Sequence, residues 1–128
     1  MKRKILFVAL MLFATLCFAE SLSQLRIVAD DGTFLGTFES EYSSNSIYNR
    51  YGTYGSKYNS SSIFNKYGTY GSDYSQYSPF SQYSYNAPWL MDGYGNIYGR
   101  LSVNRYASGV TRTTYNLALQ LKSMRDSM

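Results

Sequence analysis

The chain has 128 residues with a formal net charge of +4, and its composition includes 15 tyrosines, 10 glycines, one cysteine and no histidine. This length corresponds to one small domain. Because the only cysteine is Cys17, the chain beyond that residue has neither a histidine general base, nor a cysteine nucleophile, nor a His or Cys metal site, and we expect no cofactor.

The first 19 residues have the three parts of a secretory signal peptide. Residues 2–4 are basic, residues 5–18 are an apolar run, and Ala19 is a small residue at the expected cleavage point. The apolar run is shorter than the roughly 18 residues of a membrane-spanning helix. Lipidation of Cys17 and an uncleaved anchor are the alternatives. We expect cleavage after Ala19, no transmembrane segment afterwards, and an exported protein that is periplasmic, on the cell surface or secreted.

Cleavage also changes the charge of the protein. The Lys and Arg total falls from 12 to 9 against 8 Asp and Glu, so the net charge falls from +4 to +1. The remaining basic residues are scattered from Arg26 to Arg125 and form no cluster, so no nucleic-acid partner is expected. Without a cysteine the mature chain has no disulfide, and its core must come from aromatic side chains.

Residues 25–38, LRIVADDGTFLGTF, predict a β-hairpin. Apolar residues alternate on both sides of Asp30, Asp31 and Gly32. An Asp-Gly pair favours the left-handed turn that matches the twist of the flanking strands.

Three copies of a 16-residue unit follow, at residues 35–50, 51–66 and 67–82. Glycine, serine and aromatic residues recur in fixed columns, among them Gly36, Gly52 and Gly68; Tyr42, Tyr58 and Tyr74; and Ser46, Ser62 and Ser78. Fixed columns predict an ordered repeat, with glycine for positive φ, serine for turn bonds and aromatic rings for packing. The alternative is a disordered Tyr/Ser/Gly tract.

The conformation of one unit is less regular than a helix pair. Ser46 and Ser62 precede short apolar segments and predict caps of a single helical turn that ends at Asn49 and Asn65. Each unit is then a turn plus a loop that cannot bury its own rings. We therefore expect neighbouring units to stack their tyrosines in a shared core.

Residues 88–106 predict a second hairpin, with a turn rich in Asp, Gly and Asn between two apolar strands. Since one hairpin alone is marginally stable, the two hairpins are expected to pair in a four-stranded antiparallel sheet. The turn at residues 92–96 resembles a calcium loop, but Tyr94 occupies a ligand position and no distal Glu follows, so we interpret it as structural.

The tail, residues 107–128, predicts a short helix. Thr113 or Thr114 is the expected cap, and the apolar face consists of Leu117, Leu121, Met124 and Met128. The whole chain thus predicts a small β-rich α+β fold. Two hairpins bracket the irregular repeats in a single domain over residues 20–106, and the helix docks on the sheet or lies loosely at the end.

The motifs YGTYGSKY and YGTYGSDY, with the flanking DDGTFLGTF and DGYGNIYGRLSVN, resemble those of a family of small exported bacterial proteins. Its members carry tandem Tyr-Gly-x-Tyr-Gly-Ser-x-Tyr units bracketed by Asp-Gly-x-Tyr/Phe-x-Gly segments. The resemblance covers about residues 27–104 and implies domain boundaries but no activity. Similar proteins often have Pro after the Asn of each unit, where this chain has Arg50 and Lys66.

The aromatic residues are the candidate binding residues, because exposed rings can stack on sugar faces or hold a protein partner. The same rings can instead form the core, which is the interpretation we favour for the columns of Tyr54 and Tyr58, while Trp89 is expected to pack. The candidates are Tyr51, Tyr54, Tyr58, Tyr67, Tyr70, Tyr74 and Trp89.

No enzymatic activity is expected, since Asp30, Asp31 and Asp92 lie where turns favour aspartate. We expect a non-enzymatic structural or binding protein of the bacterial envelope or periplasm, with an envelope glycan or another envelope protein as its partner. The alternatives are a carbohydrate- or peptidoglycan-binding module that uses the tyrosines, and a disordered, self-assembling matrix protein.

Overall fold

The computed structural model describes residues 22–128. The expected signal peptide, its cleavage point at Ala19 and Cys17 lie outside the described residues. Across this described part of the chain, no helix combines the length and the apolar character that crossing a membrane requires.

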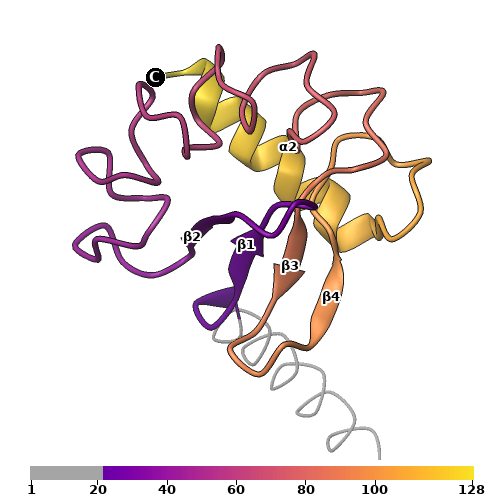
Figure 1. The fold of residues 1–128 in the computed structure, drawn as a ribbon, viewed down its shortest axis with the longest axis horizontal. Coiled ribbons are helices and arrows are strands. Elements are labelled where there is room, and N and C mark those ends of the chain that lie inside the picture. The colour runs from indigo at the N-terminus through magenta and orange to yellow at the C-terminus, as the bar shows by residue number, and fades with distance from the viewer. Residues whose placement is uncertain (1–21) are drawn as a thin grey trace, which may run out of the picture.

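Four short strands form one antiparallel sheet (Figure 1). The strands are β1 (Arg26–Val28), β2 (Phe34–Thr37), β3 (Trp89–Met91) and β4 (Ile97–Arg100). Their order is β2-β1-β3-β4, so each hairpin supplies two neighbours and the pairing of β1 with β3 joins them. The prediction of two hairpins in a four-stranded sheet is confirmed. The repeats are the long excursion between β2 and β3.

The hairpin turns explain why the strands were predictable. Gly32 has a φ of 90° and Gly95 has a φ of 88°, in the left-handed region where a side chain is strained. The short strands are mostly buried on one side: Ile27 faces the core and lies opposite Leu90 in the register of β1 and β3.

Each 16-residue unit folds as a loop built from turns, and Figure 1 shows these loops one after another with their tips directed away from the sheet. A buried serine fixes each of the first two loops. The Ser62 hydroxyl donates to the Tyr54 carbonyl oxygen at 3.1 Å and accepts the Phe64 N–H at 3.1 Å. In the first loop the Ser46 hydroxyl donates to the Glu39 carbonyl oxygen at 2.7 Å, one residue further along the unit, and accepts the Tyr48 N–H at 3.0 Å.

An asparagine completes each loop. The Asn65 side chain donates to the Asn59 carbonyl oxygen at 3.2 Å and accepts the Tyr67 N–H at 3.1 Å, and Asn49 makes the equivalent pair of bonds. The prediction that Ser46 and Ser62 cap a single turn is supported: each hydroxyl accepts the N–H two residues later, and the Asn49 and Asn65 N–H groups donate to the Ser46 and Ser62 carbonyl oxygens, each at 3.3 Å. The turn does not extend into a helix, because a hydroxyl that accepts this N–H competes with helical hydrogen bonding.

The loop that follows β4 continues the series although it lies outside the 16-residue repeat. The Asn104 side chain donates to the Ser84 carbonyl oxygen at 2.9 Å and accepts the Tyr106 N–H at 3.2 Å. The Ser102 hydroxyl accepts the Asn104 N–H at 3.0 Å. The same serine and asparagine bonds therefore shape loops on both sides of the second hairpin.

The core lies between the sheet, the inner sides of the loops and the helix. Its fully buried side chains include Ile27, Leu35, Ile47, Ile63, Phe64, Phe80, Leu101 and Leu121. Burying one such side chain stabilises the fold by about 1.5–3 kcal/mol. Since both hairpins, the repeats and the helix all contribute, none of these segments has a core of its own.

The helix α2 (Arg112–Asp126) runs along the inner side of the loops (Figure 1). Its N-cap is Thr111, whose hydroxyl accepts the Thr114 N–H at 3.2 Å, while the Thr114 hydroxyl accepts the Thr111 N–H at 2.9 Å. The predicted caps, Thr113 and Thr114, were therefore placed two and three residues too late. The capping box forms because a threonine at the third helical position can also accept a hydrogen bond.

The predicted apolar face of α2 is the face that packs. Leu121 is buried, and Leu117, Met124 and Met128 are half-buried against the core. Ala118 and the guanidinium of Arg125 are buried on the same side. The guanidinium donates to the Gly71 carbonyl oxygen at 2.6 Å, so the helix docks on the third repeat as well as on the core.

Candidate ligand-binding surface

The structure divides the predicted binding residues into two groups. Tyr51, Tyr58, Tyr67 and Tyr74 have exposed fractions of 101%, 81%, 96% and 92%. Tyr54, Tyr70 and Trp89 are half-buried. The preference for core positions is thus supported for Tyr54 and Tyr70, which pack against the core cluster, and is wrong for Tyr58 and Tyr74. A loop without a helical or strand period leaves the inward and outward columns undetermined by sequence.

The half-buried tyrosines attach the repeats to the first hairpin. The Tyr54 ring meets Phe34 edge to face, with 5.0 Å between ring centres. The Tyr70 hydroxyl donates to the Asp31 carboxylate at 2.8 Å and lies 3.1 Å from the Thr33 hydroxyl. These rings are structural, because their partners are side chains of β2 and of the turn before it.

The bonds around Asp31 make the attachment sensitive to acid. Hydrogen bonds from Thr33, together with the one from Tyr70, lower the pKa of the Asp31 carboxyl group below its ordinary value. The ionised form is therefore favoured in the folded state. Its contribution to stability is complete above the unfolded pKa of about 3.9 and is lost as the pH falls through the folded pKa.

We expect the difference in unfolding free energy between the wild-type protein and Asp31→Asn to shrink as the pH is lowered below about 4. Asparagine keeps the acceptor oxygen but has no proton to gain, so the difference isolates this carboxylate. Urea unfolding from about pH 6 to about pH 3 would measure it. When Tyr70 is replaced by Phe in both proteins, the change of this difference with pH should become smaller. A difference in unfolding free energy that stays constant with pH would contradict the assignment.

Trp89 also has a structural environment. Its indole N–H donates to Asp30 at 3.2 Å, and the guanidinium carbon of Arg100 lies 3.9 Å from the ring centre. Arg100 in turn pairs with Asp30 at 3.0 Å and donates to the Ala87 carbonyl oxygen. One face of the indole is thus covered by a cation that is itself held in place, in agreement with a packing role.

Asp92 uses its carboxylate within the β3–β4 turn. One oxygen accepts the Tyr94 and Asn96 N–H groups at 2.8 and 3.0 Å, and the other accepts the Asn96 amide at 2.9 Å and the Tyr98 hydroxyl at 3.1 Å. The Asn96 side chain in particular lowers the pKa of Asp92. These bonds are those of a structural turn. Over residues 22–128 there is no group of three or more His, Cys, Asp or Glu that could hold a metal ion.

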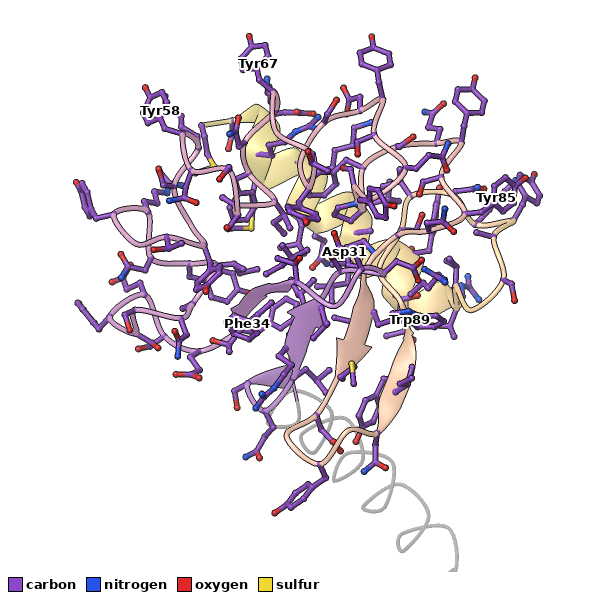
Figure 2. The ribbon with its side chains drawn as sticks, viewed as in Figure 1. Asp31, Phe34, Tyr58, Tyr67, Tyr85 and Trp89 are labelled. Carbon is purple, nitrogen blue, oxygen red and sulfur yellow. The ribbon has the colours of Figure 1, made fainter. Side chains whose placement is uncertain are left out.

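The exposed rings stand at the tips of the repeat loops, and Figure 2 shows Tyr58 and Tyr67 directed away from the molecule. They occupy two columns of the repeat: Tyr51, Tyr67 and Tyr83 in one, and Tyr42, Tyr58 and Tyr74 in the other. Tyr42 and Tyr83 were not among the candidates, although Tyr42 stands in the first copy and Tyr83 lies 16 residues after Tyr67. Their place in the 16-residue register is the signal that could have found them.

The backbone beneath these rings is fixed by side chains of the loops. The Tyr51 and Tyr67 N–H groups donate to an asparagine two residues earlier, each at 3.1 Å. The Tyr58 and Tyr74 N–H groups donate to a serine two residues earlier, again at 3.1 Å. Each exposed ring is therefore presented from a defined point, although the ring itself contacts mainly solvent.

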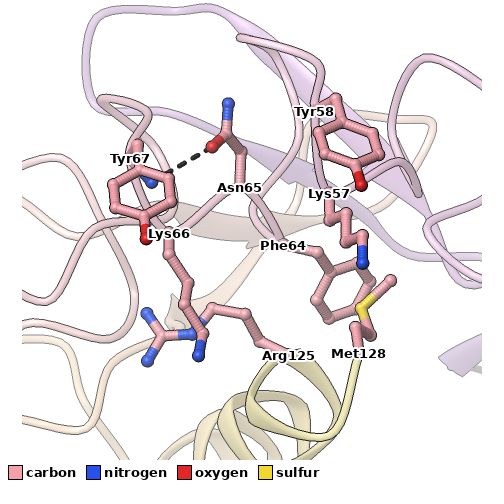
Figure 3. Close-up of a pocket in the computed structure, with 8 residues that line it drawn as sticks. All are labelled: Lys57, Tyr58, Phe64, Asn65, Lys66, Tyr67, Arg125 and Met128. Atoms are coloured by element: carbon pink, nitrogen blue, oxygen red, sulfur yellow. Dashed lines mark hydrogen bonds between the residues drawn. The ribbon is translucent and has the colours of Figure 1, made fainter.

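Two adjoining hollows lie between the loops near the end of α2. One has a volume of about 480 Å³ and is lined by Tyr58 and Tyr67, with Phe64 and Met128 on the same side as Tyr58 (Figure 3). The next has a volume of about 380 Å³ and extends along Tyr51 and Tyr58. The two hollows share Lys57, Tyr58 and Met128 among their lining residues, and we refer to them together as the depression, which Tyr51, Tyr58 and Tyr67 border.

Comparisons of this chain with protein families, with curated proteins and with solved structures found no match. The resemblance of the repeat motifs to small exported bacterial proteins stays a prediction.

Proposed function

We propose that the mature chain is an exported, non-enzymatic binding protein of the bacterial envelope that holds a glycan on its exposed tyrosine rings. The observation that carries this proposal is the set of Tyr51, Tyr58 and Tyr67. These rings are almost fully exposed, they border one depression, and their backbone is fixed by hydrogen bonds.

The stability of the fold does not explain why tyrosine occupies these exposed positions. A ring left in water contributes almost no burial to stability, whereas contiguous exposed apolar groups are typical of interaction sites. Tyrosine suits a sugar in particular, since the ring face can contact the C–H face of a pyranose and the hydroxyl can bond to its edge. Rings on successive loops would offer successive contacts to a chain of sugars.

The carboxylates support a binding role over a catalytic one. Asp31 and Asp92 accept hydrogen bonds within their turns, and Asp30 is paired with Arg100. A glycosidase mechanism needs two carboxylates that face each other across a cleft. The depression between the loops is instead lined by aromatic, basic and amide side chains.

The proposal is tested by titrating the protein over residues 20–128 with a panel of neutral and acidic envelope oligosaccharides in a calorimeter. For any glycan that binds, the double variant Tyr58→Ala/Tyr67→Ala is expected to weaken binding by roughly 10- to 30-fold, because central aromatic contacts dominate such interfaces.

Tyr94→Ala is the matched control, since Tyr94 is 94% exposed but lies in the β3–β4 turn. Its loss should leave the affinity unchanged. A panel in which no glycan binds, or a control variant that loses as much affinity as the double variant, would exclude the proposed surface.

A further inference from the structure

We infer that the depression beside Tyr51, Tyr58 and Tyr67 takes a polysaccharide that carries anionic groups, carboxylate or phosphate, along its chain. This inference rests on the proposed function and names the ligand class of the same surface. The observation behind the inference is the position of the basic side chains beside the exposed rings.

Each of these three tyrosines follows a basic residue in the sequence. The pairs are Arg50–Tyr51, Lys57–Tyr58 and Lys66–Tyr67. All three basic residues are exposed, and each lines one or both of the hollows that its tyrosine borders. The Lys57 ammonium lies 5.3 Å from the centre of the Tyr58 ring. A ligand that contacts these rings must therefore lie beside several cations.

The charge of these cations is largely unmatched. Neither hollow is lined by an acidic side chain among residues 22–128. Arg50 and Lys57 form no ion pair within that part of the chain, and Lys66 lies 3.9 Å from Asp126 with both side chains about half exposed, a pairing that contributes little. The buried Arg125 is different, because Asp73 and Asp126 already balance it.

The pairing of basic residues with exposed tyrosines is local and is not a consequence of a high overall positive charge. The chain beyond residue 19 has a net charge of only +1, from 9 basic and 8 acidic residues. The other exposed tyrosines of the two columns do not follow basic residues: Tyr42 follows Glu41, Tyr74 follows Asp73 and Tyr83 follows Gln82. Basic residues thus precede the three tyrosines that border the depression, while Glu41 lines the neighbouring hollows together with Arg50.

The geometry suits a sugar unit that bears an anionic substituent. Figure 3 shows Tyr58 and Tyr67 on opposite sides of the hollow, with the Lys57 and Lys66 side chains extending from them toward Arg125 and Met128. A pyranose that contacts the Tyr58 ring would bring its substituents near the Lys57 ammonium. Because exposed charges act over about 8–10 Å at ordinary ionic strength, repeated anionic groups would be attracted by all three cations.

The test compares oligogalacturonate with the same oligosaccharide fully methyl-esterified, in which neutral methyl ester groups replace the charged carboxylates. The acid form is expected to bind roughly 10-fold or more tightly, and its affinity should fall as salt is raised. A glycerol-phosphate oligomer that carries sugars is the third probe. Its affinity, compared with that of oligogalacturonate, shows whether carboxylate or phosphate is the preferred anionic group.

Lys57→Gln/Lys66→Gln is expected to weaken binding of the acid form by roughly 5- to 20-fold and to leave the ester unchanged. The matched control is Arg26→Gln/Arg112→Gln, which removes two exposed charges from β1 and from the start of α2. Arg112 lies roughly 20 Å along the helix from Arg125.

Equal binding of the acid and the ester overturns the inference and leaves the proposed function standing. A control double variant that weakens binding as much as the lysine variant also overturns it, because the attraction would then be one of net charge. If none of the three probes binds and no oligosaccharide of the panel binds either, both the inference and the proposed function are wrong.

Discussion

Gly71→Ala is expected to lower the free energy of unfolding by about 2–4 kcal/mol, the cost of overpacking at a site where backbone meets backbone. A Cβ on Gly71 would overlap the Asn65 carbonyl oxygen and would lie 2.5 Å from the Ile63 carbonyl oxygen. Neither atom belongs to a flexible side chain. The preceding loop must therefore move, although its asparagine and serine bonds hold it.

Gly93→Ala is the matched control for this substitution. The nearest atom to a Cβ at Gly93 is the end of the flexible Arg26 side chain, at 3.4 Å. The change should be neutral, or stabilising by up to about 0.5–1 kcal/mol through the entropy of the unfolded chain. Urea unfolding of the two variants measures the difference, and equal midpoints would show that the loops do not pack as closely as the structure places them.

The role of the repeat glycines is one feature that the sequence could not supply. We expected positive φ, yet of the repeat glycines only Gly36 has it, with a φ of 119°. Gly55 and Gly71 instead lie against the carbonyl groups of the neighbouring turn. A conserved register within the repeat shows that a position has one fixed role. It does not distinguish a backbone angle from a close approach, because both requirements exclude every side chain.

The hairpins were predictable because their signals are local. An Asp-Gly turn fixes the direction of the chain within four residues, and the alternation around it selects the buried face. The loops have no such period. Whether Tyr54 or Tyr58 points inward depends on bonds such as that of Ser62 with the Tyr54 carbonyl oxygen, which join residues eight apart and appear only once the loop has formed.

The candidate surface was therefore found in part. The periodic columns identified the exposed Tyr51 and Tyr67, but they also included Tyr70, whose hydroxyl bonds to the first hairpin. The basic residues beside the rings were read as scattered along the chain. In the structure Lys57 lines one hollow with Lys66 and the adjoining hollow with Arg50.

Arg125→Met is expected to lower the free energy of unfolding by about 2–3 kcal/mol, because it removes charged hydrogen bonds and leaves a buried acceptor unpaired. The Arg125 side chain is 2% exposed, and its guanidinium lies 4.9 Å from the centre of the Phe80 ring. It donates to the Gly71 carbonyl oxygen at 2.6 Å and to Asp73 at 2.8 Å. Methionine keeps the apolar stem but provides no donor.

Most of this cost is assigned to the carbonyl group of Gly71. The side chains of Asp73 and Asp126 are 46% and 48% exposed, so water can solvate their carboxylates when the cation is removed. Arg125→Lys should recover only part of the stability, since one ammonium cannot reproduce the planar array of donors. Arg112→Met, at an exposed position of the same helix, should change the unfolding free energy by less than about 0.5 kcal/mol.

The two substitutions act at one point of contact, so their effects should not add. Gly71→Ala moves the carbonyl group that Arg125 binds, and Arg125→Met removes the donor from that carbonyl group. The double variant is therefore expected to lose less stability than the sum of the single losses, by about 0.5–3 kcal/mol. Strict additivity in urea unfolding would show that the helix does not depend on the third loop for its docking. A coupled loss would mean that α2 and the tyrosine-bearing loops unfold as a unit.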